Sequence, residues 1–413
     1  MAIDRNKGKT LIEDIDKVFE ATLGKLNPQI QQFVKERILG PALTEFRELI
    51  TDSRAPSLFL IGRSGHGKSS VINMLAGKRV AEVGDVKPTT PGATLYLITF
   101  EDKFASWNVV DSRGLFETTP PAGAVTADSV EALKVDLRKY EPDVILHVVS
   151  APEARNLERD LEVFKELRET MIRQGVSLPP AIVALNKVDL LDDPRDWPPE
   201  VSARKAGQIK KCLDYMARIL LVIEPTQIDR NFSIRGYTTS DTSYPAIIPI
   251  CALEGDEWNR DTLVDYIGGT LPKSALLDFA QAARRKHLLR RMSTDFIKRF
   301  SGIATAIGAT PIPVSDMAIL IPLQQLMVAV VGGLSCRLPT LDTAKEYLAA
   351  AGINLAVAFA ARELARWATE FAPPVAAGVS GALAGTITYG IGKSAEHYFF
   401  AGEIRKPEEF KQN

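Results

Sequence analysis

Ser57-Leu-Phe-Leu-Ile-Gly-Arg-Ser-Gly-His-Gly-Lys-Ser-Ser70 is an apolar run of strand-forming residues that passes into a glycine-rich loop and then into a helical pattern. The loop fits the P-loop spacing, in which a glycine is followed after four residues by Gly-Lys-Ser. Glycines let main-chain N–H groups face inward, and the N-terminus of the next helix adds positive charge at the same point. A glycine-rich turn could match by chance, but the order of strand, loop and helix favours phosphate binding. We therefore expect a polyphosphate to be held by Gly62, Arg63, Ser64, Gly65, His66, Gly67, Lys68, Ser69 and Ser70.

Two segments indicate how the phosphates and a metal ion would be held. In the loop, Lys68 is placed to reach the β- and γ-phosphates and the Ser69 hydroxyl to bind the bridging Mg²⁺. The segment 107–114 is a predicted strand that ends in Asp111-x-x-Gly114. This spacing brings the Asp111 carboxylate to the metal and the Gly114 N–H to the γ-phosphate.

Two further strand ends indicate the base. Segment 181–189 is a predicted buried strand that closes on Asn186-Lys187-x-Asp189. A carboxylate at Asp189 can accept hydrogen bonds from N1–H and the exocyclic amine of guanine, and adenine offers neither donor there. Segment 246–253 is a predicted strand closing on Cys251-Ala252-Leu253, where small residues let main-chain N–H groups approach the base. The expected partner is thus a guanine nucleotide.

The four motifs, in this order and each at a strand end, resemble those of the translation-factor-like bacterial GTPases, the Era, MnmE and EngA group. The resemblance covers about residues 57–271. It implies an α/β P-loop GTPase domain with a mostly parallel sheet between helices, GTP and GDP as ligands, and Mg²⁺-dependent hydrolysis of GTP. It also implies that Lys187 flanks the guanine plane, and that Ser69 and Asp111 hold Mg²⁺ directly and through water.

The segment 83–92 occupies the place of the first switch loop, where a threonine closes on Mg²⁺ and the γ-phosphate. Thr90 is the candidate on that loop; Thr94 is the alternative, but it already belongs to the alternating pattern of the next strand, 94–100. Thr90 therefore joins Ser69 and Asp111 as a metal ligand, and Lys68, Thr90 and Gly114 form the predicted catalytic set.

Two departures from the resembled families concern water activation. The potassium-activated members carry asparagine where this chain has Gly65, so stimulation by potassium is not expected. Ras-like GTPases place a glutamine after the Asp-x-x-Gly motif, where this chain has Leu115, which cannot orient water. We expect slow intrinsic turnover, with a water-activating group supplied by a switch residue or across an interface. Arg63 and Arg113 are the nearest charged candidates, although either could be only a solvated loop arginine.

Single residues add three expectations. His66 is interpreted as a spacer that projects outward from the P-loop, rather than as a general base. His147, inside the predicted strand 143–150, is interpreted as a core histidine. Pro249 suggests that the strand before Cys251 lies at a sheet edge, because proline cannot donate to a neighbouring strand.

Composition sets the broad class. The 413 residues contain 50 Lys and Arg against 51 Asp and Glu, so net charge gives no argument for nucleic acid as a partner. The three cysteines, Cys212, Cys251 and Cys336, have no paired spacing, which argues against disulfides and a zinc site. The first residues lack the apolar core of a signal peptide, so we expect a cytoplasmic chain.

Helices are predicted on both sides of the nucleotide-binding region. The expected domains are an N-terminal helical segment at 1–55, the GTPase domain at 56–272, a helical domain at 273–395 and a charged tail at 396–413. The N-terminal helices could pack on the GTPase domain or return to the C-terminal helices. The insertion 224–244 is polar and turn-rich, as a partner-binding loop would be.

The C-terminal third, at about 285–392, resembles the YcjF-like helical domain in its Pro311-x-Pro313 turn, Asp316 and the glutamine-containing helix that follows. The resemblance implies an effector domain suspected of membrane association. A basic helix face could lie on anionic lipid or simply be solvated; it is formed by Arg284, Arg285, Lys286, Arg290 and Arg291. Segments 317–336 and 371–392 are uncharged over about the 20 residues that a spanning helix needs. Their prolines, glutamines, alanines and glycines favour a buried bundle.

Two functions remain open from the sequence. The first is a GTPase switch whose nucleotide state moves a helical effector domain. The second is a dynamin-like or immunity-GTPase-like membrane-associated protein, in which the helices on both sides form one assembly unit. Both admit a homodimer or larger assembly and an anionic membrane surface as partners, and neither uses a recognisable nucleic-acid module.

Overall fold

The computed structural model describes residues 10–14, 17, 28, 32, 36, 40–47, 53–77, 79, 94–100, 105–111, 127–220, 225–283, 285–309, 317–335, 337–351 and 380–410. These residues belong to two compact units. The sheet unit comprises Ala55–Thr99 and Ser106–Phe279, and the helical unit comprises Met1–Arg54, Phe100–Ala105 and Ala280–Asn413.

The sheet unit is built on eight strands in the order β2-β3-β1-β4-β5-β8-β7-β6. The strands are β1 Ser57–Ile61, β2 Thr94–Phe100, β3 Ala105–Asp111, β4 Val144–Ser150, β5 Ala181–Asn186, β6 Thr226–Gln227, β7 Tyr237–Thr238 and β8 Ala246–Pro249. Strands β3, β1, β4, β5 and β8 run parallel to one another, whereas β7 and β6 add an antiparallel edge beside β8. A parallel sheet requires crossover connections, and helices supply them.

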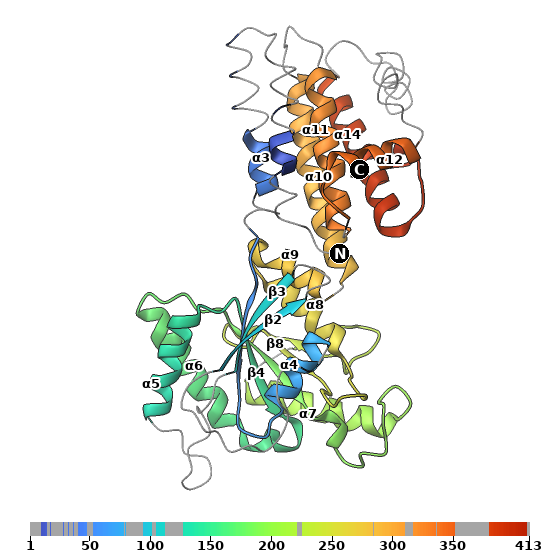
Figure 1. Ribbon diagram of the computed structural model, residues 1–413. Coiled ribbons are helices and arrows are strands. Elements are labelled where there is room, and N and C mark those ends of the chain that lie inside the picture. Colours follow the sequence, from blue (N-terminus) through green and yellow to red (C-terminus); the bar gives the residue numbers. More distant parts are fainter. Residues whose placement is uncertain are drawn as a thin grey trace. The chain divides into compact units, whose positions relative to one another are not determined.

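The helices that flank this sheet are α4 Lys68–Ala76, α5 Ala127–Tyr140, α6 Glu158–Arg173, α7 Ala203–Ile219, α8 Arg260–Thr270 and α9 Lys273–Ala282 (Figure 1). Two short 3₁₀ helices, η4 Ala151–Asn156 and η5 Val188–Leu190, follow β4 and β5. The expected α/β class, with a mostly parallel sheet between helices, is confirmed.

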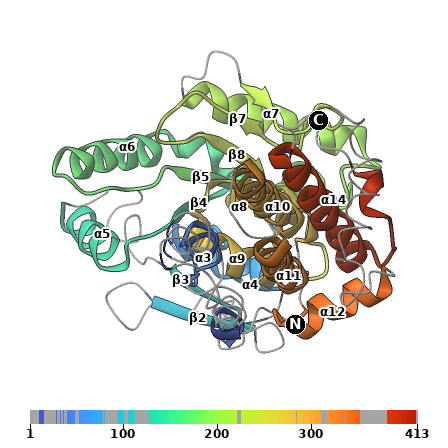
Figure 2. The same cartoon turned by 90° about the horizontal axis from the view of Figure 1, so that it is seen from above.

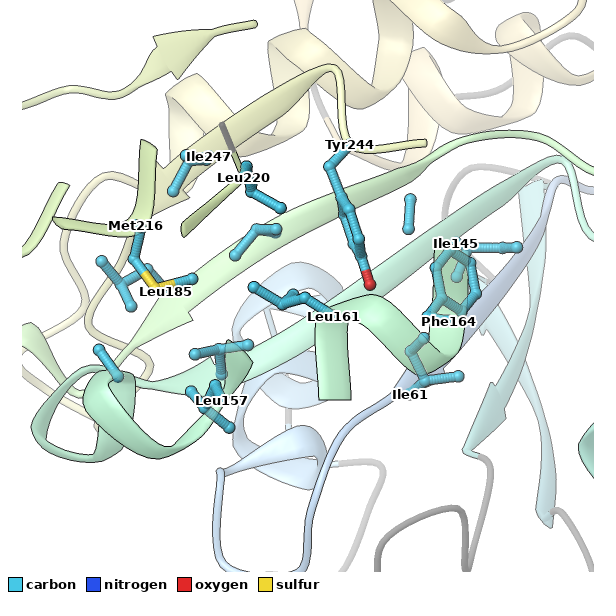
Figure 3. Packing of buried hydrophobic residues seen from close by; sticks show 14 of the residues in the cluster. Ile61, Ile145, Leu157, Leu161, Phe164, Leu185, Met216, Leu220, Tyr244 and Ile247 are labelled. Carbon is cyan, nitrogen blue, oxygen red and sulfur yellow. The ribbon is translucent and has the colours of Figure 1, made fainter. Parts of the chain in front are cut away.

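The core of the sheet unit is centred on β1, β4 and β5, which are buried along their whole lengths. Such strands read as continuous apolar runs, as parallel strands covered on both faces do. Helix α6 buries Leu161, Phe164 and Leu167 against them. Figure 3 shows Tyr244 pointing into this core beside Leu161 and Phe164. His147 lies there as well, 1% exposed, with Nδ1 2.8 Å from the Tyr244 hydroxyl, so its interpretation as a core histidine is confirmed.

The expected edge position of the strand before Cys251 is wrong. Strand β8 lies between β5, which it pairs in parallel, and β7, which it pairs antiparallel. Pro249 is tolerated because β7 pairs only with Ala246 and Ile247, two residues earlier. The polar insertion 224–244 provides β6 and β7 and so extends the sheet.

The helical unit contains α3 Gly40–Phe46, α10 Lys286–Ala309, α11 Met317–Leu334, α12 Leu341–Ala350, α14 Ser380–Ala401 and a 3₁₀ helix, η6 Pro407–Glu409. Helix α14 packs along α10 and α11 (Figure 2). Glycines allow this approach: a Cβ at Gly392 would press on Ile297 and Met327, and one at Gly385 would collide with Thr305. The N-terminal helix α3 packs on α10, where Arg299 pairs with Glu45. Two placements were left open for the N-terminal helices. Helix α3 packs on the C-terminal helices, which is the second of them.

Among the helices that the structure describes, none combines the length and the hydrophobicity of a membrane-spanning segment. The first uncharged segment forms α11, whose Leu323, Leu326 and Met327 are completely buried. The second segment is described only from Ser380 onward. The Pro311-x-Pro313 turn and Asp316 lie outside the described residues, so the YcjF-like interpretation stays a prediction.

Candidate functional site

Those predicted site residues that the structure describes lie at the carboxyl ends of the parallel strands, which meet at one edge of the sheet. Pairing registers place Leu60 beside Asp111, Ile61 beside His147, and Ser150 beside Asn186. Open α/β sheets bind ligands outside this edge. The fold therefore brings the P-loop, Asp111 and the Asn186-Lys187-x-Asp189 motif to the same edge.

The P-loop conformation depends on its glycines. Gly62, Gly65 and Gly67 have φ angles of 146°, 79° and 90°, which residues with a side chain rarely adopt. Two of them also lie against other groups: a Cβ at Gly62 would collide with the Val148 carbonyl, and one at Gly67 would collide with the Asn186 side-chain amide. Helix α4 begins immediately afterwards at Lys68, so its N-terminus faces the loop. The geometry is that of an anion-binding helix terminus.

Lys68 is held inside the loop that it follows. Its side chain is 8% exposed, and Nζ donates to the carbonyls of Gly62 at 3.0 Å and Arg63 at 3.3 Å. The ammonium is thereby kept beside the loop, as the predicted contact with β- and γ-phosphates requires.

Asn186 joins three of the predicted motifs. It is 2% exposed, its Nδ2 donates to the His66 carbonyl at 3.0 Å, and its Oδ1 accepts from the Ala252 N–H at 3.1 Å. The amide thus connects the P-loop, the end of β5 and the loop after β8. A buried amide with both ends satisfied fixes these three segments relative to one another.

Asp189 and Cys251 come from the two motifs assigned to the base. Burial raises the pKa of the Cys251 thiol to about 12, and the negative charge of the nearby Asp189 carboxylate adds to the shift. Leu253 is 55% exposed beside them. A cavity of about 340 Å³ lies between the α4 region and the loop after β8. It is lined by Ser70, Asn73, Met74, Gly77, Arg79, Ala252, Leu253, Glu254 and Glu257.

Two P-loop side chains are oriented differently from the sequence expectation. His66 does not project outward: it is 1% exposed, with Nδ1 3.2 Å from the Val148 carbonyl and Nε2 3.4 Å from Glu153 Oε2. Burial lowers its pKa. The outward orientation is therefore wrong, because the imidazole is buried against Val148 of β4 and Glu153 of η4.

Arg63 is neither solvated nor extended toward the phosphates. Its guanidinium donates two hydrogen bonds to the buried Asp160 carboxylate, from Nε to Oδ2 at 2.6 Å and from Nη2 to Oδ1 at 2.8 Å. Nη2 also donates to the Asn156 carbonyl. Such a paired fork gives strong geometric specificity. Arg63 thus anchors the P-loop to η4 and to the start of α6, so it is not a solvated loop arginine in this structure.

The donor set fits a magnesium ion bound together with phosphates. Ser69 supplies a hydroxyl at the start of α4, and Asp111 supplies a carboxylate that is 9% exposed at the end of β3. Mg²⁺ is usually held by one or two carboxylates plus phosphate and water oxygens. Within the described residues no group of three His, Cys, Asp or Glu side chains gathers around a metal site. Thr90, Gly114, Arg113 and Leu115 lie outside those residues, so their predicted roles stay predictions.

Lys205 is a buried residue near the site that was not predicted from the sequence. Lys205, on the first turn of α7, is 1% exposed, and its ammonium contacts the loop that carries Asp189. The available signal was its spacing: it precedes Ile209, Leu213 and Met216 on the buried stripe of α7. A lysine on an apolar stripe is rarely buried without a polar partner.

Comparison with known proteins gives a consistent result. Residues 57–187 match the family model described as "50S ribosome-binding GTPase". The curated proteins named GTPase Der from Maridesulfovibrio salexigens and Campylobacter lari are 29% and 31% identical over 162 and 142 residues, or 38% and 34% of this chain. These matches span only 33% and 27% of the relatives' own length. A structure of Era from Aquifex aeolicus bound to GDP.AlF4- aligns with 63% of this chain and 70% of its own, at 21% identity and a TM-score of 0.34.

Proposed function

We propose that the chain is a Mg²⁺-dependent switch that binds GTP and hydrolyses it to GDP and phosphate, because residues 57–187 match a GTPase family model and resemble the GTPase Der proteins. The observation that carries this proposal is the Asn186 bridge, which holds the phosphate loop and both base-side loops together. Family resemblance concerns only the order of the motifs along the chain, whereas the bridge supports the proposal because it joins the P-loop to the end of β5 and to the loop after β8.

The residues divide the work as follows. Lys68 and the loop from Gly62 to Ser70 bind the phosphates, while Asp189 accepts hydrogen bonds from guanine, with Lys187 beside the ring and Cys251, Ala252 and Leu253 around it. Ser69, Asp111 and Thr90 would hold Mg²⁺, which supplies charge neutralisation at the β- and γ-phosphate oxygens. The position of Lys187 supports its proposed role beside the guanine ring, because its side chain lies next to the P-loop. A Cβ at Gly67 would lie 3.8 Å from Lys187 Cε.

The Asp189→Asn substitution tests the proposal directly. It replaces an acceptor with a donor opposite the guanine amine, so GTP affinity should fall by about a hundredfold or more while xanthosine triphosphate gains affinity. Titration of the purified full chain with both nucleotides measures the exchange. Asp192→Asn is the matched control, because Asp192 lies three residues further along and pairs with Arg204. Unchanged GTP binding by the Asp189 variant would refute the assignment of this motif.

A second function is favoured by one observation in the helical unit. Helix α3 precedes the GTPase domain and α10 follows it, yet they pack together through the Arg299–Glu45 pair. Such a joint unit supports the dynamin-like or immunity-GTPase-like alternative, in which the helices form an assembly element. Attraction to lipid has weaker support, since Arg290 on the basic face is bound to Glu396.

Liposome flotation separates the two functions. A membrane-associated assembly protein should float with anionic vesicles when a non-hydrolysable GTP analogue is present, and less so with GDP. A cytoplasmic switch should stay with the unbound fraction in both nucleotide states. Neutral vesicles control for association that does not depend on charge.

A further inference from the structure

Lys205 is a buried cation in an unfavourable position. It is the third residue of α7, after the N-cap Ser202, and its side chain is 1% exposed. The positive end of the helix dipole disfavours a cation in the first turn. Removing an ammonium from water carries a further cost that an apolar side chain of similar size would avoid. Something in the surroundings must therefore stabilise the charge.

The stabilising groups belong to the loop that reads the base. Lys205 Nζ donates to the Asp189 carbonyl at 2.7 Å and to the Leu191 carbonyl. These carbonyls belong to the end of η5, which begins after Lys187 in a left-handed conformation with φ of 62°. Carbonyls at a helix C-terminus carry partial negative charge and are favourable partners for an ammonium.

Asp189 is thus held through its main chain. Its carbonyl is bound by Lys205 from α7, while its carboxylate lies near the Cys251 thiol, which follows the neighbouring strand β8. A carboxylate that must face two donors of a base needs a main chain that does not rotate. The exposed pair of Arg204 with Asp192, on the same turn of α7, is bonded to side-chain oxygens and leaves the Asp189 peptide untouched.

We propose that Lys205 is a positioning residue for guanine recognition, which holds the Asp189 peptide so that the carboxylate meets the base edge. The inference rests on the proposed function and adds a specificity determinant that lies outside the four nucleotide motifs. Lys205 contributes equally to the binding of GTP and GDP, because it acts on the base side of the site and not on the phosphates.

The test uses Lys205→Met in the full chain, with GTP, GDP and inosine triphosphate as probes. Inosine lacks the exocyclic amine of guanine, so the ratio of GTP to inosine triphosphate affinity reports how well Asp189 is aligned. We expect GTP and GDP affinity to fall by the same factor, about tenfold, and the GTP preference over inosine triphosphate to shrink. In turnover the KM should rise while kcat stays unchanged, as for loss of uniform binding. Arg204→Met is the matched control and should keep the wild-type ratio.

The ratio separates positioning from folding. A variant that is only partly folded binds both nucleotides less in proportion, so a ratio equal to wild type would overturn the proposal even if both affinities fell. An unchanged GTP affinity would overturn it too. A wild-type chain that does not prefer GTP to ATP would instead refute the proposed function, and this is measured first.

Discussion

At the scale of single residues, Lys68 and Ser69 are neighbours with different chemistry. Lys68 offers a charge to the phosphates and Ser69 a hydroxyl to the metal, so their alanine variants should fail in different ways. Lys68→Ala should weaken GTP binding with and without Mg²⁺, whereas Ser69→Ala should weaken it only when Mg²⁺ is present. Titrations in Mg²⁺ and in EDTA measure both. Equal losses for the two variants in EDTA would contradict the metal role of Ser69.

His147 makes the stability of the sheet unit depend on pH. Burial lowers its pKa from 6.5 to about 3, so the unfolded chain binds a proton that the folded chain does not bind between these values. The free energy of unfolding should therefore fall as pH drops below about 6.5, with this residue contributing up to about 1.4 kcal/mol per pH unit.

The His147→Gln variant removes this contribution and keeps a hydrogen-bonding group beside Tyr244. Urea denaturation between pH 7 and pH 5 should give a shallower pH dependence than wild type. His287→Gln, on the exposed surface of α10, is the control. Parallel pH profiles for wild type and His147→Gln would contradict the assignment.

The orientations of Arg63 and His66 could not be predicted from sequence. The P-loop pattern is local, so spacing alone identified every loop residue. The partners of these two side chains, Asp160 and Glu153, lie 97 and 87 positions further along the chain. No short-range pattern encodes such pairs. Lys205 differs, because its place on the apolar stripe of α7 is visible in the sequence, although the carbonyls that it contacts are not.

At the scale of elements, the long apolar strands and amphipathic helices were predictable because their periodicity is strong. Strand β8 was placed at an edge because of Pro249, and the two-residue strands β6 and β7 that extend the sheet are too short and polar to produce a pattern. The proline rule itself holds: Pro249 lacks a donor, and the neighbouring strand β7 does not reach it. The edge prediction for β8 failed because the sequence did not reveal its neighbour β7.

The pairing of α10 with α14 depends on a carboxylate with no solvent exposure. Glu396 accepts hydrogen bonds from Arg290 Nε at 3.0 Å and Thr294 Oγ1 at 2.8 Å on α10, and from Lys393 on its own helix. The Glu396→Gln variant keeps the shape and removes the charge, which leaves two cations without their counter-ion. We expect the helical unit to lose roughly 2 kcal/mol of stability, less than for a wholly buried pair because Arg290 is half exposed.

Chemical denaturation measures this loss. Glu346→Gln provides the control, since its pair with Arg337 is on the surface and should contribute at most about 1 kcal/mol. If both variants unfold at the same denaturant concentration, the buried carboxylate does not hold α10 and α14 together.

At the scale of the whole molecule, fewer groups remain that could activate the attacking water. Leu115 cannot orient water, Gly65 offers no potassium ligand, and Arg63 is bound to Asp160. A group from a switch segment, Arg113 included, or from a second molecule remains. If a second molecule supplies it, turnover per chain should rise with protein concentration or on anionic vesicles, and potassium should act no differently from sodium.

A dilution series over about a hundredfold range, with and without vesicles, tests self-activation. The Lys68→Ala variant sets the background rate. Turnover per chain that stays flat in both series would exclude self-activation and leave an internal residue or a different protein as the source.

The anchoring of the P-loop has a consequence for the speed of nucleotide capture. Arg63 bonds the loop to α6, His66 bonds it to β4, and Asn186 bonds it to β5. A receptor loop that is already fixed loses little conformational freedom when its ligand arrives. Association should then be a single encounter without a slow rearrangement of the loop. In stopped-flow mixing the observed rate should rise linearly with nucleotide concentration, whereas an Arg63→Ala chain should approach a plateau set by the ordering of its loosened loop.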